Sequence, residues 1–263
     1  MKRLVCLFCT AAVLIQAGFA SAATCAEVPI PKYGPAGAPY ATPLWQSHEY
    51  LQSTRNPAPD FWKLIPHYEG QKSGLSCSVA AVAMVLNAIA RTRADLRASD
   101  ANFLEAKLID DVKAAHWKER VSHGGWKGRA GLTLTELEEV VRGALETYRI
   151  RDWTTSVRSF KSAEPGDLAG LRAIFEANEA SADDFVIIHF LQDRLTDDPG
   201  GPYVHISPVG AYDASTGRVL VLDVDHEYYG PYWVPVERLL IAVSASTPTY
   251  GHGGVLIVRR IPK

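Results

Sequence analysis

Three residues able to form a nucleophile–base–carboxylate set stand far apart in the 263-residue chain. Cys77 begins the segment CSVAAVAMVLNAIAR, and the dipole of a helix favours a thiolate at its N-terminus. His205 lies in VHISPVGAY and Asp223 in GRVLVLDV, two segments joined by turn residues. A thiol beside an imidazole that a carboxylate orients is the arrangement used in nucleophilic catalysis. The three residues therefore predict a covalent, cysteine-dependent reaction.

Hairpin geometry indicates how His205 and Asp223 would meet. If the turn is centred at residue 214, the ladder register places His205 directly opposite Asp223. Opposed residues of an antiparallel pair have Cβ atoms about 4.5–5.5 Å apart on one face. That distance allows a hydrogen bond between imidazole and carboxylate. A register shift of one residue would instead place the two side chains on opposite faces.

Hydrophobic periodicity predicts the elements that position these residues. Helices are expected over 77–91, over 133–147 behind a Thr133/Glu136 capping box, and over 166–178. Along the chain, the expected helices come first and the strands of an antiparallel sheet come last, an order that is typical of an α+β fold. His116, Trp117, His123 and Trp126 are expected in a surface loop. The expected strands are 184–192, 204–212, 217–224 and a last one from Gly254.

The chain opens with a targeting pattern. Two basic residues precede an apolar run that ends in small residues at 20–22, as in a cleaved secretory signal peptide. We expect a signal peptide over 1–23, an extended lead-in rich in Pro, Gly, Ala and Ser over 24–47, and one catalytic domain over 48–263. The mature protein would be periplasmic or secreted, with no membrane association after cleavage.

Composition excludes several classes of function. Hydrophobic residues make up 47% of the chain and charged residues 21%, which is typical of a folded globular protein. The formal net charge is −2, so no basic surface for nucleic acid is expected. Cys6 and Cys9 leave with the signal peptide. The sequence leaves open whether Cys25 and Cys77 form a disulfide, which an oxidising compartment would allow.

Four segments occur in one order along the chain: QKSGLSCS with VAAVAMVLNAI, HISPVG, LDV and YGPYWVPV. Together they resemble the phytochelatin synthase family, a branch of the papain-like cysteine peptidases. The similarity covers roughly residues 48–260. It is closest in form to the short bacterial members, which lack the cysteine-rich C-terminal region of the plant enzymes.

The resemblance implies a papain-like fold with an N-terminal helical lobe and a C-terminal antiparallel-sheet lobe. The helical lobe would carry the Cys77 helix, and the sheet lobe would carry His205 and Asp223. Cys77 would attack glutathione at the carbonyl that joins γ-glutamylcysteine to glycine. His205 would move the proton and Asp223 would orient His205. Gln71, with the backbone N–H of Cys77, would form the oxyanion hole.

Water as acceptor would make the enzyme a glutathione hydrolase, and a second glutathione would make it a phytochelatin synthase. The short bacterial form favours hydrolysis first. The resemblance implies no bound cofactor and no metal ligands. Cadmium or zinc would enter as part of a metal–glutathione substrate. The sequence leaves open whether the protein forms a homodimer.

Three positions depart from the family pattern. Ser78 follows the nucleophile where the family has glycine. Gln192 and Gly253 replace basic residues that hold substrate carboxylates in the family. Arg194 lies close to Gln192 in sequence and is therefore the candidate substrate-binding residue.

Two other functions remain open at this point. The displaced basic residues favour a papain-like peptidase that acts on another exported peptide. The run from Asp223 to His226 is similar to a metal-ligand cluster. Cys77, Asp225 and His226 could then bind a heavy metal or a metal–thiolate without catalysis.

Overall fold

The computed structural model describes residues 41–92, 102–197 and 200–262. In this part of the chain, a seven-stranded antiparallel sheet has the order β1-β6-β5-β4-β3-β9-β2. Its strands are β1 (Thr42–Pro43), β2 (Trp153–Ser159), β3 (Asp184–Leu191), β4 (Val204–Asp213), β5 (Arg218–Val221), β6 (Tyr232–Pro235) and β9 (Gly254–Arg260). A separate two-stranded sheet pairs β7 (Ser246–Thr247) with β8 (Gly251–His252).

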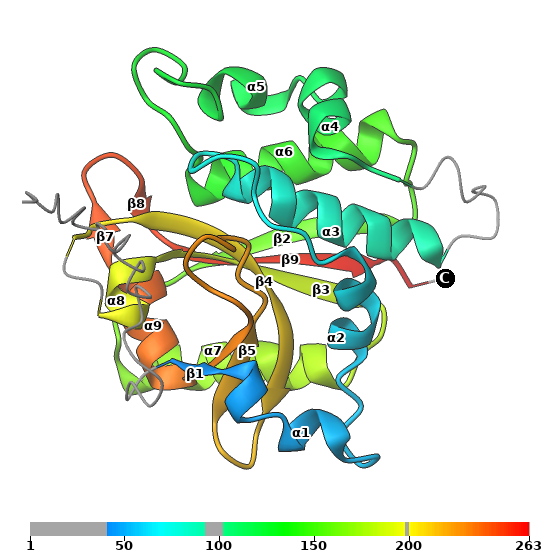
Figure 1. Cartoon of the computed structure of the whole chain (residues 1–263), viewed down its shortest axis with the longest axis vertical. Coiled ribbons are helices and arrows are strands. Elements are labelled where there is room, and N and C mark those ends of the chain that lie inside the picture. Colours follow the sequence, from blue (N-terminus) through cyan, green and yellow to red (C-terminus); the bar gives the residue numbers. More distant parts are fainter. Residues whose placement is uncertain (1–40, 93–101, 198–199, 263) are drawn as a thin grey trace, which may run out of the picture.

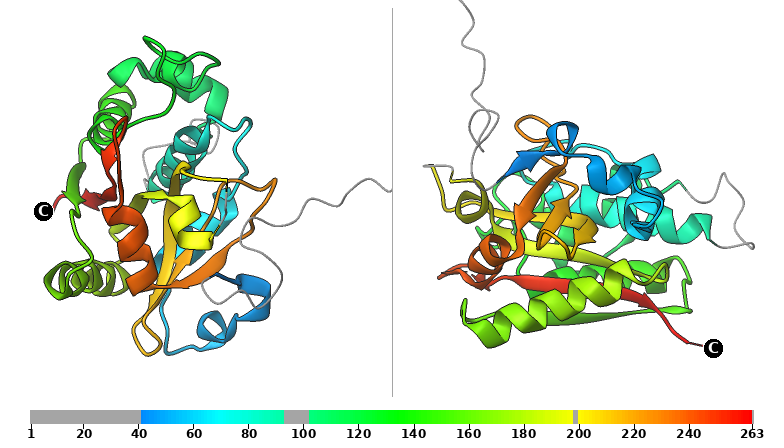
Figure 2. Two further views of the ribbon diagram at one scale, coloured as in Figure 1. Left: turned by 90° about the vertical axis from the view of Figure 1, so that its left-hand side faces the viewer. Right: turned by 90° about the horizontal axis from the view of Figure 1, so that it is seen from below.

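Helices and single helical turns cover both faces of the large sheet (Figures 1 and 2). The α-helices are α1 (Glu49–Gln52), α2 (Pro59–Leu64), α3 (Cys77–Arg91), α4 (Glu105–Asp111), α5 (Trp117–Arg120), α6 (Leu134–Thr147), α7 (Pro165–Glu179), α8 (Gln192–Thr196) and α9 (Val236–Ser244). The 3-10 turns are η1 (Leu44–Gln46), η2 (Ile65–His67) and η3 (Ala114–His116). This α+β architecture with a large antiparallel sheet is compatible with a papain-like fold.

Two hydrophobic cores lie on opposite faces of the sheet. The first joins α3 and α6 to the sheet, and the second joins α7 and α9 to the other face. Along β3, Phe185 and Ile187 belong to the first core, and Val186 and Ile188 to the second. A strand covered on both faces can be apolar at successive positions, which explains the run FVIIHFL.

The helix that carries Cys77 has the bounds expected from the sequence. All residues from Ser78 to Ala90 in α3 are buried, and the alanines in this stretch permit close contact with the sheet and α4. The Thr133/Glu136 capping box is present at the start of α6. Both predictions are confirmed.

The expected order of helices before strands is wrong, because β1 precedes the helices and α8 lies between β3 and β4. Strand β2 precedes α7 in the chain, and α9 lies between β6 and the last strand. β2 pairs at the edge of the sheet, and only its first residue, Trp153, is buried. Its Thr, Ser and Arg side chains give no hydrophobic alternation, so the sequence carries no clear strand signal there.

The expected signal peptide over 1–23, and the lead-in up to residue 40, lie outside the described residues. Within the described ranges, no helix combines the length and the apolar character needed to cross a membrane.

Glu179, the last residue of α7, connects three distant segments. Its Oε1 accepts hydrogen bonds from Tyr50 Oη at 2.8 Å and from the backbone N–H of Ala58 at 2.9 Å. Its Oε2 accepts from the N–H of Tyr212 at 2.8 Å. The side chain thereby fixes the segment between α1 and α2 against the strand that carries His205.

We expect Glu179→Ala to lower the free energy of unfolding by about 2–3 kcal/mol, because two backbone donors and one hydroxyl lose a charged acceptor. Urea unfolding followed by tryptophan fluorescence measures this change. The control is Glu176→Ala, an exposed residue of the same helix, with an expected change below about 0.5 kcal/mol. Equal stability of the two variants would contradict the assignment.

Candidate active site

Cys77 is the first residue of α3 and carries a half-buried, free thiol. The preceding Ser76 does not cap the helix with its side chain, because its Oγ accepts from Ser73 N at 3.0 Å and donates to Ser73 O at 3.2 Å. The first N–H groups of a helix have no acceptor within it, so the positive end of α3 is directed toward the thiol. Cys25, the partner that the sequence left open for a disulfide with Cys77, lies outside the described residues.

The segment before Cys77 is joined to the strand end that carries Asp223. Gln71 N donates to Val224 O at 2.7 Å, and Tyr68 Oη donates to the backbone oxygen of Asp223. Gly70 lies against His226, where an added Cβ would stand 2.7 Å from the ring Cγ. This close approach requires glycine, and it brings Gln71 to the end of the sheet where the triad residues lie.

His205 and Asp223 form a buried hydrogen bond. The distance from His205 Nε2 to Asp223 Oδ1 is 2.8 Å, and the two residues are 4% and 0% exposed. The His205 ring also packs edge-to-face on Phe190, with ring centroids 5.6 Å apart. The predicted contact between imidazole and carboxylate is therefore present.

The strand register that the sequence predicted for this contact, with His205 directly opposite Asp223, is wrong. A bulge at Gly210 shifts the register, and β5 ends at Val221, two residues before Asp223. Leu222 N still donates to Pro208 O, so Asp223 stands beside Ser207 and not directly opposite His205. The two residues still share a face, because side chains alternate with a period of two along a strand.

Four donors surround the Asp223 carboxylate. Oδ1 accepts from His205 and from Asp225 N at 2.9 Å, and Oδ2 accepts from Gln192 Nε2 at 3.1 Å and Tyr232 Oη at 2.8 Å. Burial opposes ionisation, but the charge of His205 and these hydrogen bonds hold the pKa of Asp223 below its usual value. Asp223 is therefore a fully buried anion.

The Asp223 anion changes the pKa of His205. Burial disfavours the imidazolium, but the charge and hydrogen bond of Asp223, together with a hydrogen bond to Cys77, raise the pKa of His205 to about 10. Since Nε2 is taken by Asp223, Nδ1 is the ring nitrogen left for Cys77. An imidazolium next to a thiol favours the thiolate, which is the nucleophilic form.

Gln71, Gln192 and His205 line one pocket of about 440 Å³. Its wall also holds two carboxylates and three tyrosines, namely Asp225, Glu227, Tyr203, Tyr228 and Tyr250. The sequence indicated none of the tyrosines. Tyr250 reaches the pocket from the β7–β8 turn, and its Oη donates to Ala130 O at 2.7 Å across the fold.

Arg194 is not placed with the other predicted site residues. Its side chain is 62% exposed, lies 3.5 Å from Asp193, and does not line the pocket. Gly253 cannot be replaced by a basic residue without moving the backbone, because an added Cβ would stand 2.1 Å from His189 O. The side-chain amide of Gln192 donates a hydrogen bond to the Asp223 carboxylate, and it is this protein carboxylate that occupies its donor.

Ser78 has a structural partner that the sequence did not indicate. Its Oγ accepts a hydrogen bond from Trp117 Nε1 at 2.9 Å, and both residues are buried. The expectation of a surface loop is wrong for Trp117, because α5 begins there and its indole packs beside the first turn of α3. Trp126 is half-buried and stacks on His116 with ring centroids 4.1 Å apart.

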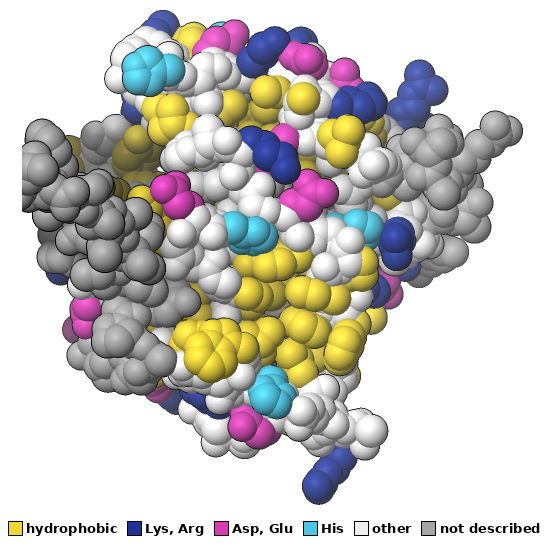
Figure 3. Space-filling model, in the orientation of Figure 1, with side chains coloured by type: hydrophobic (Ala, Val, Ile, Leu, Met, Phe, Trp, Pro, Cys, Tyr) yellow, Lys and Arg dark blue, Asp and Glu magenta, His cyan; other side chains and the backbone are white. Residues whose placement is uncertain are grey.

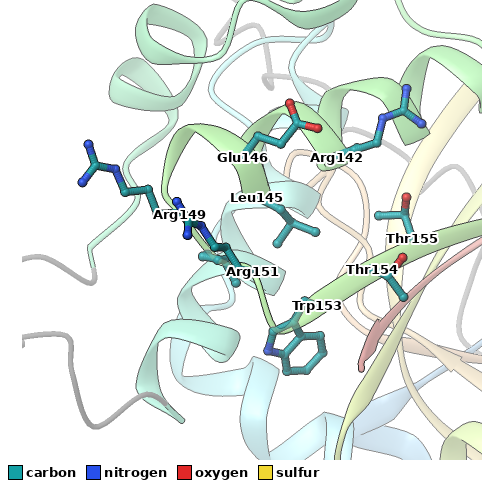
Figure 4. A pocket seen from close by; sticks show the side chains of 9 residues that line it. Arg142, Leu145, Glu146, Arg149, Arg151, Trp153, Thr154 and Thr155 are labelled. Carbon is teal, nitrogen blue, oxygen red and sulfur yellow. The ribbon is translucent and has the colours of Figure 1, made fainter. Parts of the chain in front are cut away.

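The described ranges hold no metal cluster beside this site. No three His, Cys, Asp or Glu side chains are grouped there to hold a metal ion, so Cys77, Asp225 and His226 do not form the predicted cluster. Another pocket, of about 450 Å³, lies at the end of α6 beside Arg142, Arg149 and Arg151 (Figure 4). Neither a thiol nor a histidine lines it, so pocket size alone does not locate the chemistry.

We expect the imidazole of His205 to stay protonated through neutral pH and to lose its proton near pH 10. In Asp223→Asn the proton should be lost at much lower pH, because burial then acts without the anion. Nitrogen-15 NMR of the imidazole measures both titrations.

Protein stability gives a second check on the same assignment. A base with a raised pKa stabilises the fold fully below about pH 6.5 and loses that contribution as the pH rises toward 10. This decline should be absent in Asp223→Asn and retained in Asp197→Asn, an exposed carboxylate paired with Arg238. Equal slopes in all three proteins would contradict the buried ion pair.

Comparison with known proteins matches this chain to one family. The phytochelatin synthase family model matches residues 46–252, which include Gln71, Cys77, His205 and Asp223. Glutathione gamma-glutamylcysteinyltransferase 3 of Lotus japonicus is 24% identical over 206 residues, which are 77% of this chain and 38% of that relative. Glutathione gamma-glutamylcysteinyltransferase 1 of Triticum aestivum is 25% identical over 203 residues, which are 76% and 36%. The chain thus spans little more than a third of the length of these relatives. Because the matched span covers most of the chain, this protein belongs to the phytochelatin synthase family.

Proposed function

We propose that this protein cleaves glutathione through a covalent Cys77 intermediate and transfers the γ-glutamylcysteine unit. The observation that carries the proposal is the buried bond of 2.8 Å between His205 Nε2 and Asp223 Oδ1, with Cys77 as the further partner of His205. The names of the matched relatives, glutathione gamma-glutamylcysteinyltransferases, point to the same reaction.

Acylation begins when the Cys77 thiolate attacks the carbonyl carbon that joins cysteine to glycine in glutathione. The carbonyl oxygen becomes an oxyanion, and the N–H of Cys77 and the side-chain amide of Gln71 stabilise it. One such donor contributes about 10²–10³-fold to the rate. Gln71 lines the pocket, and its buried Oε1 has no hydrogen-bond partner among the described residues. The C–N bond then breaks, and His205 gives its proton to the departing amine of glycine.

Deacylation releases γ-glutamylcysteine from the Cys77 thioester. Neutral His205 takes a proton from the acceptor, which attacks the thioester carbonyl, and the thiolate leaves. Water as acceptor completes hydrolysis, and the amine of a second glutathione gives phytochelatin. Asp225 and Glu227 line the pocket, and their charge opposes a second anionic glutathione but not water. This charge supports hydrolysis as the main outcome.

The papain-like lobe arrangement, the cellular location and the role of metals are parts of the same proposal. The α3–α6 region would form the helical lobe with Cys77, and the strands would form the lobe with His205 and Asp223. The signal pattern at 1–23 supports export. Cadmium or zinc would be bound by the thiol of glutathione and enter as substrate. Acidic and basic side chains are interspersed on the face in Figure 3, which supports the absence of nucleic-acid binding.

A peptidase that acts on another exported peptide is the second candidate. It is favoured by the pocket wall, where no Lys or Arg occurs among the described lining residues, and by the backbone contact that keeps side chains out of position 253. A panel of peptides compared with glutathione separates the two functions. Cleavage of an α-linked peptide in preference to glutathione would support the peptidase.

We expect reduced protein to convert glutathione to glycine and γ-glutamylcysteine, and Cys77→Ala to lose at least about 10³-fold in rate. Mass spectrometry, with and without cadmium, measures these products and any longer (γ-glutamylcysteine)n-glycine chains. Cys25→Ser is the matched control and should keep full activity. Glycine release that persists unchanged in Cys77→Ala would refute the covalent mechanism.

A further inference from the structure

The two oxygens of the Asp223 carboxylate have separate sets of partners. Oδ1 accepts from His205 Nε2 and from the backbone N–H of Asp225, and Oδ2 accepts from Gln192 Nε2 and Tyr232 Oη. Gln192 is 2% exposed and Tyr232 is fully buried. Gln192 begins α8 directly after β3, and Tyr232 is the first residue of β6, so two elements on opposite sides of β4 and β5 meet at one oxygen.

We propose that Gln192 and Tyr232 are positioning residues that hold the Asp223 carboxylate in the one orientation in which Oδ1 meets His205. This inference rests on the proposed function only in assuming that the contact between Cys77 and His205 is used. Neither residue touches the reacting atoms in the mechanism above, and each acts through Asp223.

The need for such donors follows from torsional freedom. The carboxylate of an aspartate rotates about a broad, nearly two-fold torsion, so bond geometry alone does not fix its plane. At a fully buried position hydrogen bonds must fix it, and an unsatisfied carboxylate oxygen would be costly. The side-chain donors on Oδ2, together with the backbone N–H of Asp225 on Oδ1, therefore fix the carboxylate plane and through it the orientation of the imidazole.

The neutrality of both donors is equally important. Gln192 occupies a position where an arginine would place a second cation on the same carboxylate. That cation would compete with His205 for the charge of Asp223 and lower the affinity of His205 for its proton. A neutral amide and a phenol orient the carboxylate without adding a cation, so the imidazolium of His205 is the positive charge that interacts with it.

Other groups around Asp223 define what the test must keep constant. His205 faces it from β4 and Tyr232 from β6. Asp225 and His226 follow it in the chain, and Tyr68 contacts its backbone oxygen from the segment after η2. None of these is changed in the Gln192 variants, and the Tyr232 variant keeps the aromatic ring.

The test measures the alkylation rate of Cys77 by iodoacetamide as a function of pH, in the full chain and without substrate. We expect Tyr232→Phe and Gln192→Leu each to move the acidic limb to higher pH by about one unit, because a carboxylate that loses a donor takes up a proton more readily. At a pH on that limb, alkylation should slow about ten-fold. Gln192→Arg keeps a donor but adds charge, and should instead move the alkaline limb to lower pH.

Tyr229→Phe is the matched control. This neighbouring buried tyrosine has its ring centroid 5.9 Å from that of Tyr232 and its Oη 3.5 Å from Thr196 Oγ1. We expect the unchanged profile from it. Circular dichroism establishes which variants fold. If Tyr232→Phe does not fold, the alkylation profile of Gln192→Leu tests the proposal.

Unchanged profiles in folded Tyr232→Phe and Gln192→Leu would overturn the inference even if glutathione is turned over. Shifted profiles without any turnover of glutathione would support the inference and refute the proposed function. The two failures are therefore distinguishable in one set of proteins.

Discussion

The charge of Asp223 is the constraint on which the site depends. A carboxylate fully removed from water is unstable unless donors replace its hydration. Here the donors come from β4, from β6, from the start of α8 and from the backbone after β5. Only a sheet in which β6, β5, β4 and β3 are neighbours brings these elements together, so the strand order and the catalytic geometry share one cause.

The nucleophile belongs to a different part of the fold. Cys77 is carried by α3, whose first turn is held to α5 through Ser78 and Trp117. Two contacts, Gln71 N to Val224 O and Tyr68 Oη to Asp223 O, join this part to the strand end. The pair of His205 and Asp223 is thus built within the sheet, and the thiol is brought to it by α3, which packs directly on β4, and by the segment that precedes α3.

The sequence predicts best where one local pattern decides. The period of apolar residues and alanines fixed the bounds of α3, and the capping box fixed the start of α6. The contact of His205 with Asp223 was predicted correctly in spite of a wrong register, because an error of two residues keeps the same face. Partners that depend on distant segments, such as Tyr232, Gln192 and Trp117, have no local signature. Strand β2 is too polar to show the alternation that marks a strand.

The contact of Gly253 with the backbone of β3 has an evolutionary consequence. A side chain at this position would need the chain at Gly253 to move away from both β3 and the end of α9, because His189 O and Val243 O stand 2.1 and 3.0 Å from an added Cβ. A basic side chain at position 253 therefore requires a shift of the backbone in addition to the substitution itself. A single substitution here would loosen the packing of β3 and α9 before it could add a charge, so the backbone contact opposes change at this position.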